Sequence, residues 1–172
     1  YKGIDTDILE NGNLIVNFGS AWYFHFQSFD QGLSYQIVLE QNSKTDEQVV
    51  FNYLLANEHA FLQSVDFKLK RAAQTVKFAY NPQMKLIAVF VDEEPEPLAR
   101  YDYDTQGNLI IAVDQNAQTR SYEYNAHHQL TRYTDRTGRG QNVRYESTLA
   151  NAKAIEEWAD DGSFHTRLEW HP

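Results

Sequence analysis

The stretch that decides the fold is Tyr101-Asp102-Tyr103-Asp104-Thr105-Gln106-Gly107-Asn108-Leu109, because its pattern returns later in the chain. Tyr122-Glu123-Tyr124-Asn125 repeats its beginning at an offset of 21 residues. The same offset links Leu109 to Leu130, Asp114 to Asp135 and Tyr124 to Tyr145. Five correspondences at one spacing indicate an internal repeat, and a fixed period of this length is typical of repeat architectures.

Each repeat predicts a β-hairpin. The motif Tyr-X-Tyr puts two rings on one face of a strand, because strand side chains alternate between faces. Asp104 to Gly107 supplies turn residues, since an Asp side chain bonds backbone N–H groups two residues further on. Leu109, Ile111 and Val113 are then expected to share one face of the return strand. The 21-residue repeat thus holds two strands of about six residues and two turns.

Twelve positions are expected to build the repeat as structural positions, with Tyr103 and Tyr124 as structural anchors. They are Tyr101, Tyr103, Asp104, Gly107, Leu109, Asp114, Tyr122, Tyr124, Leu130, Asp135, Gly138 and Tyr145. We expect the tyrosines to align across neighbouring strands, where aromatic pairs stabilise a sheet. Asp160 is expected to open a turn as Asp114 and Asp135 do, and a further repeat fits if four residues are inserted between Tyr145 and Ile155.

At these residues the sequence resembles the YD repeat of Rhs proteins, whose pattern is roughly Tyr-X-Tyr-Asp-X-X-Gly-Asn/Arg-Leu followed by an Asp turn. The repeat beginning at Arg100 matches almost completely, whereas the next has His128 in place of the Gly. The resemblance is clear over about residues 99–145 and extends more weakly to 76 and 170. The family's self-cleavage segment, Asp-Pro-X-Gly, is not matched, because Asp135-Arg136-Thr137-Gly138 lacks the Pro and lies inside a repeat.

The resemblance implies a fold and a function. Rhs and related YD-repeat proteins build a spiralling β-sheet that closes into a hollow shell. In bacterial polymorphic toxins this shell encloses a C-terminal toxin domain, and similar shells occur in insecticidal toxin complexes and teneurins. The chain would then be one arc of the wall. Its partners would be the remaining shell segments, the enclosed toxin and components of a secretion system such as type VI. It would be made in the cytoplasm of a bacterium and exported as an effector.

The first half of the chain predicts more strands. Leu14 to Phe18 and Trp22 to Gln27 read as a hairpin, and Tyr35 to Glu40 and Val49 to Leu55 as two strands around a polar loop, Gln41 to Gln48. For 60–73 and 147–159 a helix is the alternative, and we favour strands in both, with a turn at 151–153. The expected organisation is an N-terminal region of degenerate β-hairpin repeats (1–92), an acidic proline-containing connection (93–98) and a YD-repeat region (99–172).

The amino-acid composition argues against several classes of function. With 42% hydrophobic and 23% charged residues the chain is not a disordered type. A net charge of −9 argues against a nucleic-acid partner, and no apolar run is long enough to span a membrane. There is no Cys, and the six His lack helical metal-ligand spacing, so we expect no metal or cofactor.

Every repeated polar residue has a turn or surface explanation, so we expect a protein that is not an enzyme. A small hydrolase on a β-scaffold is the least favoured reading. A free-standing YD-repeat module that binds glycan or a partner protein is the principal alternative to the shell segment, since rows of tyrosines can stack on sugar rings.

Overall fold

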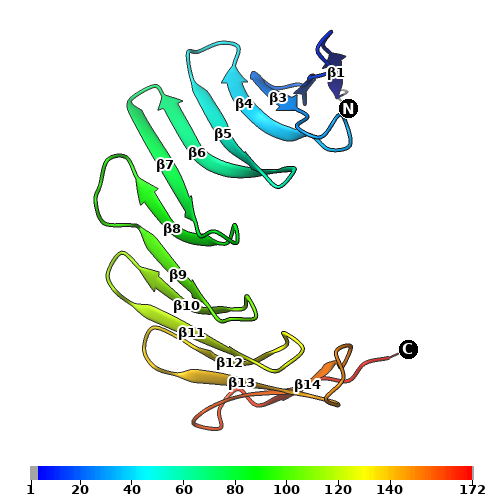
Figure 1. Ribbon diagram of the computed structural model, residues 1–172, viewed down its shortest axis with the longest axis vertical. Coiled ribbons are helices and arrows are strands. Elements are labelled where there is room, and N and C mark those ends of the chain that lie inside the picture. The colour runs from blue at the N-terminus through cyan, green and yellow to red at the C-terminus, as the bar shows by residue number, and fades with distance from the viewer. Residues whose placement is uncertain (1–3, 172) are drawn as a thin grey trace. The chain divides into compact units, whose positions relative to one another are not determined.

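The computed structural model describes residues 4–171, which contain fifteen β-strands and no helix (Figure 1). The predicted all-β fold of antiparallel hairpins is confirmed. The chain divides into two compact units, residues 1–96 and 97–172, with the boundary inside the acidic proline-containing stretch. The division into degenerate repeats, connection and YD-repeat region stays a prediction.

Each strand of the first unit pairs antiparallel with the next along the chain. The strands are β1 (Asp5–Ile8), β2 (Leu14–Asn17), β3 (Trp22–Gln27), β4 (Gln36–Asn42), β5 (Gln48–Ala56), β6 (His59–Leu69), β7 (Ala72–Tyr80) and β8 (Leu86–Val91). The hairpin β2–β3 and the strand expected within 60–73 are confirmed. The polar loop is shorter than predicted, because ladder pairing continues to Asn42 and resumes at Gln48.

The second unit follows the same rule, and Figure 1 shows its strands joined by connections that alternate between the two strand ends. Its strands are β9 (Ala99–Tyr103), β10 (Leu109–Asp114), β11 (Thr119–Tyr124), β12 (Leu130–Thr134), β13 (Gly140–Tyr145), β14 (Ala154–Ala159) and β15 (Thr166–Arg167). The strand expected within 147–159 is confirmed as β14.

In the hairpin β5–β6 the two faces of the sheet differ in polarity. Cross-strand partners on the apolar face include Val49 with Phe67, and Phe51 with Val65. On the polar face, the Asn52 amide donates to Ser64 Oγ (3.0 Å) and to Asp66 Oδ2 (2.7 Å). Contacts between strands join only strands that are consecutive in the chain, so this sheet is a single layer.

Burial is accordingly shallow. Among the described residues, the buried hydrophobic side chains are Val49, Val65, Ala88 and Ala159, and no large side chain is fully buried. A single-layer sheet leaves each side chain in contact with strand neighbours but open above, which explains the half-buried aromatic residues. No stretch of residues 4–171 forms a helix long and apolar enough to cross a membrane.

Candidate functional site

The repeated element of the structure is a hairpin that carries a β-bulge next to an aromatic–aliphatic pair, here named the bulge pair. Within residues 4–171 the second strand of each such hairpin has one extra residue, and the bulge pair lies on the turn side of it. The six bulge pairs are Phe26–Ile37, Tyr53–Leu62, Tyr80–Leu86, Tyr103–Leu109, Tyr124–Leu130 and Tyr145–Ala154. The same device therefore recurs in both units.

Tyrosine hydroxyls of the bulge pairs join one hairpin to the one before it. Tyr53 donates to the carbonyl of Ile37 (2.9 Å), Tyr80 to that of Leu62 (2.7 Å) and Tyr145 to that of Leu130 (3.0 Å). Each acceptor is the aliphatic partner in the preceding bulge pair. These three tyrosine hydroxyls thus fix the position of each hairpin relative to the one before it.

Among the five tyrosines that belong to bulge pairs, burial raises the pKa of four, because their surroundings disfavour the phenolate. They are Tyr53, Tyr80, Tyr103 and Tyr124. The rings of Tyr103 and Tyr124 are half-buried rather than fully buried. Their role as structural anchors stays a prediction, and the half-buried rings reflect a sheet that no second layer covers.

Two expectations about which side chains lie next to one another are wrong. The Cα partner of Tyr101 is Ala112 and that of Tyr122 is Tyr133, so the Tyr-X-Tyr strands are not neighbours. The return strand β10 lies between β9 and β11, and the return strand β12 lies between β11 and β13. Leu109 and Ile111 do not continue one alternating face, because the bulge between them resets the register.

One hydrogen-bond pattern is shared by the turns that open at Leu9, Asn81, Asp104, Asp114, Asn125, Asp135 and Ala159. The first turn residue donates its N–H to the carbonyl four residues on and accepts, at its own carbonyl, the N–H three residues on, as in a type I turn with a bulge. Asp104 pairs in this way with Asn108 and Gly107 (both 3.0 Å). Its carboxylate also accepts the N–H groups of Gln106 and Asn108. Hydrogen bonds from Asn108 are the main cause that lowers the pKa of Asp104.

Asp114 and Asp135 open turns as predicted. Asp114 Oδ1 accepts from the N–H of Asn116 (2.9 Å), and Asp135 Oδ1 from that of Thr137 (2.8 Å). Gly107 and Gly138 both lie at φ 85°, in the left-handed conformation that closes each turn. His128 takes this conformation at φ 62°, which explains how the repeat without a Gly keeps its shape.

Asp160 does not open a turn, contrary to the expectation, because Ala159 occupies that place. Its carboxylate instead receives both terminal nitrogens of Arg132 (2.6 Å each), the Asn142 amide (3.1 Å) and the Gly140 N–H (3.1 Å). Arg132 is the main cause that holds the pKa of Asp160 well below its usual range. A Cβ on Gly140 would collide with the Arg132 guanidinium, so the glycine leaves room for this ion pair.

Glu156 on β14 is a second charged centre and is only 8% exposed. Arg144 Nε donates to it (2.6 Å), His165 Nε2 lies 2.6 Å from its Oε1, and Arg167 Nε lies 3.4 Å away. Contacts with His165 first, and then with Arg144, lower its pKa to about 2. The cluster ties β13 and the short strand β15 to β14.

Turns of consecutive repeats also bond to one another at one end of the strands. His128 Nδ1 lies 2.6 Å from Asn108 Oδ1. Gln129 Nε2 reaches the carbonyls of Leu149 (3.3 Å), Ala150 (3.2 Å) and Ala152 (3.1 Å) in the next loop. The loop is one residue shorter than predicted, because Ala154 rather than Ile155 takes the place of Leu130. These contacts fix the spacing of the turns along that end.

Sequence reasoning missed Phe26, Tyr53 and Glu156. Phe26, Tyr53 and Tyr80 lie 27 residues apart, so a search at 21 residues did not find the first two. The signal that identifies them is an aromatic residue followed by a turn and an aliphatic residue. Glu156 had no sequence signal, because its neighbours Arg144, His165 and Arg167 come together only in the folded sheet. Among residues 4–171, no three His, Asp or Glu side chains are grouped so as to hold a metal ion.

Comparisons with known proteins agree with this geometry. Residues 103–139 match the family model described as RHS Repeat. The crystal structures TcdB2-TccC3-Cdc42 and TcdB2-TccC3-TEV are similar in fold, each with a TM-score of 0.51. They are 12% and 13% identical to this chain and cover 95% and 96% of it, whereas the chain spans only 8% and 9% of theirs. A search of curated proteins found no match. The resemblance to the Rhs, or YD-repeat, family is thereby confirmed: the chain carries an RHS repeat at residues 103–139.

Proposed function

We propose that this chain is one segment of the wall of an Rhs-type β-shell that encloses a toxin domain. The observation that carries the proposal is the single-layer sheet of the first unit, built from hairpins that repeat one bulge pair. A hairpin needs neighbours to be stable, so such a ribbon is extended by adding further hairpins. This is the property that a wall requires.

The mechanism is steric. A closed wall hides strand edges and keeps the cargo away from water, proteases and the host cytoplasm until delivery. Its partners would be the other wall segments, the enclosed toxin and components of a secretion apparatus. The proposal includes export from a bacterial cell, because an enclosed toxin acts in another cell. No catalytic role is assigned to the wall, since turns, ladders and ion pairs account for the repeated polar groups.

The proposal is tested by measuring how well an enclosed C-terminal domain is protected from proteases in the full-length protein that contains this chain. Leu62→Asp puts a charge into a bulge pair and is expected to open the wall, so that an enclosed domain becomes digestible. Gln63→Asp is the matched control, because Gln63 is the exposed extra residue of the same bulge and should leave protection intact. Equal digestion of the C-terminal domain in the wild type and in both variants would overturn the proposal. A parent chain without further repeats would favour the free-standing binding module instead.

A further inference from the structure

The turn between β1 and β2 contains two neighbouring residues that can react with each other. Asn11 and Gly12 are its third and fourth residues; both are exposed, and Gly12 lies at φ 80°. The turn has the shared hydrogen-bond pattern, because the Leu9 N–H donates to the Asn13 carbonyl and the Gly12 N–H to the Leu9 carbonyl (2.8 Å each). The Asn11 amide thus stands beside the backbone nitrogen of a glycine, and water reaches both.

The reaction is closure of a five-membered ring. The backbone nitrogen after an asparagine can attack the side-chain carbon Cγ, because nitrogen, carbonyl carbon, Cα, Cβ and Cγ form such a ring. Glycine allows this approach best, since it has no Cβ and its backbone adopts more conformations. The Asn13 N–H donates to Asn11 Oδ1 (3.1 Å). This bond polarises the side-chain carbonyl and stabilises the negative charge that attack places on Oδ1.

We propose that Asn11 is a site of spontaneous deamidation, which forms isoaspartate there and loosens β1. The Gly12 nitrogen loses its proton to solvent and forms a bond to Asn11 Cγ. The bond from Cγ to Nδ2 breaks, and Nδ2 leaves as ammonia. Water then opens the cyclic imide at one of its two carbonyls and leaves either aspartate or isoaspartate. Water is the co-reactant, and nothing is oxidised or reduced.

The other turns that have glycine at the fourth position carry different third residues. These are Gln106, Thr137 and Asp161. Glutamine would need a six-membered ring, and threonine has no side-chain carbonyl. The Asp161 carboxylate accepts the Ser163 hydroxyl (2.6 Å) and N–H (2.9 Å), and an Arg139 nitrogen lies 3.2 Å away. Hydrogen bonds from Ser163 chiefly lower the pKa of Asp161, so it is ionised and resists attack by nitrogen.

Asn116 is the comparison that matches Asn11 in turn position. It is the third residue of the turn that Asp114 opens, and Ala117 follows it at φ 57°. The Ala117 N–H donates to the Asp114 carbonyl (3.0 Å), so the attacking nitrogen is held as that of Gly12 is. The Cβ of Ala117 is the difference, because it crowds the approach to Cγ.

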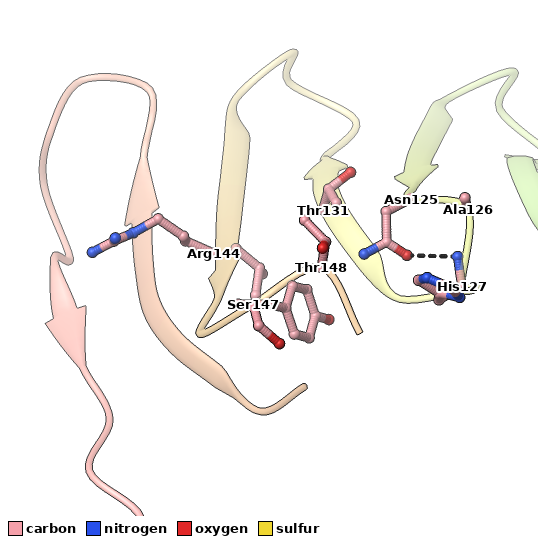
Figure 2. Close-up of a pocket in the computed structure, with 9 residues that line it drawn as sticks. Asn125, Ala126, His127, Thr131, Arg144, Ser147 and Thr148 are labelled. Carbon is pink, nitrogen blue, oxygen red and sulfur yellow. Dashed lines mark hydrogen bonds between the residues drawn. The ribbon is translucent and has the colours of Figure 1, made fainter. Parts of the chain in front are cut away.

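Asn125 is the comparison that matches Asn11 in its side-chain hydrogen bond. Its Oδ1 accepts the N–H two residues on, that of His127 (3.0 Å), which is the dashed line in Figure 2. The next residue is Ala126 rather than glycine. We therefore expect both comparison asparagines to react slowly.

Isoaspartate at this place weakens the end of the sheet. It lengthens the backbone of the turn by one methylene and adds a negative charge. β1 pairs with β2 over four positions, and all four of its residues are exposed. The turn is therefore a large part of what holds β1. This inference does not depend on the shell proposal, because it concerns a single turn.

Incubation of the full chain in mildly alkaline buffer tests the proposal. Mass spectrometry of proteolytic peptides measures the replacement of each amide NH2 by OH, and isoaspartyl methyltransferase labels the isoaspartate. We expect Asn11 to convert at least about tenfold faster than Asn116 and Asn125. Amide exchange in β1, followed by nuclear magnetic resonance, should become faster as Asn11 converts.

Reciprocal variants separate the effect of the glycine from that of the place in the fold. Gly12→Ala should slow conversion of Asn11 by about tenfold, and Ala117→Gly should speed conversion of Asn116 by a similar factor. Ala117→Gly relieves a left-handed alanine, so it keeps the test decisive even if Gly12→Ala weakens its turn. Asn11→Gln retains an amide and should give no isoaspartate at this position.

Four results would overturn the proposal. The first is conversion of Asn116 or Asn125 as fast as that of Asn11. The second is an unchanged rate in both Gly12→Ala and Ala117→Gly. The third is isoaspartate formation at Asp161 as fast as at Asn11. The fourth is unchanged amide exchange in β1 after complete conversion, which would mean that the modification does not loosen the strand.

Discussion

At the scale of single residues, the fourth position of the shared turn is the most informative. It lies in the left-handed region in every such turn, and three of its occupants are not glycine: Met84, Ala117 and His128. A side chain in this conformation is strained, because Cβ approaches the backbone carbonyl. These turns hold their shape through hydrogen bonds rather than through backbone preference.

Ala117→Gly should therefore stabilise the protein by about 1 kcal/mol, since glycine adopts this conformation without strain. Ala126→Gly is the control, because Ala126 lies in a turn of the same kind but outside the left-handed region. That change should be neutral or destabilise by about 0.5 kcal/mol. Urea unfolding of the two variants measures the difference, and a loss of stability on Ala117→Gly would contradict the strain argument.

Tyr80→Phe tests the hydroxyl bond between hairpins. The change keeps the ring and leaves the Leu62 carbonyl without its tyrosine donor, so we expect a loss of about 1 kcal/mol. Tyr133→Phe is the matched control, because the Tyr133 ring contacts Tyr122 while its hydroxyl makes no hydrogen bond within residues 4–171. Equal unfolding midpoints for the two variants would mean that the bond between hairpins adds no stability.

At the scale of the element, β15 depends on few interactions. It has two residues, and Glu156 on β14 binds both His165 and Arg167 from this end of the chain. Trp170 Nε1 adds one bond to the Ala154 carbonyl (2.7 Å). The attachment of β15 therefore relies on Glu156 together with a short ladder and a few hydrogen bonds.

Acid should release β15 before the rest of the second unit. The folded pKa of Glu156, about 2, lies below its ordinary value of 4.5, so its contribution is complete above pH 4.5 and is lost as the pH falls towards 2. Protection of the Leu168 amide, which bonds the Ile155 carbonyl, should fall over this range. Hydrogen exchange at matched intrinsic rates measures it.

Two variants complete this test. Glu156→Gln should lower the protection of the Leu168 amide at pH 6 and make this protection less dependent on pH. The glutamine side chain is uncharged, so it cannot form the ion pair that the Glu156 carboxylate forms with Arg167 or bind His165 as a carboxylate does. Glu157→Gln, which changes the adjacent residue on the opposite face of β14, should behave as the wild type. An unchanged pH profile in Glu156→Gln would mean that other groups hold β15.

At the scale of the whole molecule, the unpaired edges of β1 and β15 determine how the chain associates with other chains. β1 has a ladder partner on one side, β2, and β15 also has one, β14. Unpaired N–H and C=O groups at such edges attract other strands, and the net charge of −9 opposes this only in part.

We therefore expect the isolated chain to self-associate. Sedimentation velocity over micromolar concentrations should give a weight-average mass that rises with concentration. A stable monomer with slow amide exchange in β1 and β15 would contradict this expectation and favour a free-standing module over a wall segment.

The sequence by itself determined the repeat, the strand type and the turns of residues 99–145, because Tyr-X-Tyr, Asp and Gly act through local geometry with a constant period. Asp104, Asp114 and Asp135 needed only their own neighbours in the chain. The tertiary structure decided the rest. The bulge beside Leu109, the separation of the tyrosine strands, the Arg132–Asp160 ion pair and the cations around Glu156 all depend on which strands lie next to one another. Cross-strand register is set by pairing between residues that are distant in the sequence, so a local sequence pattern does not predict it.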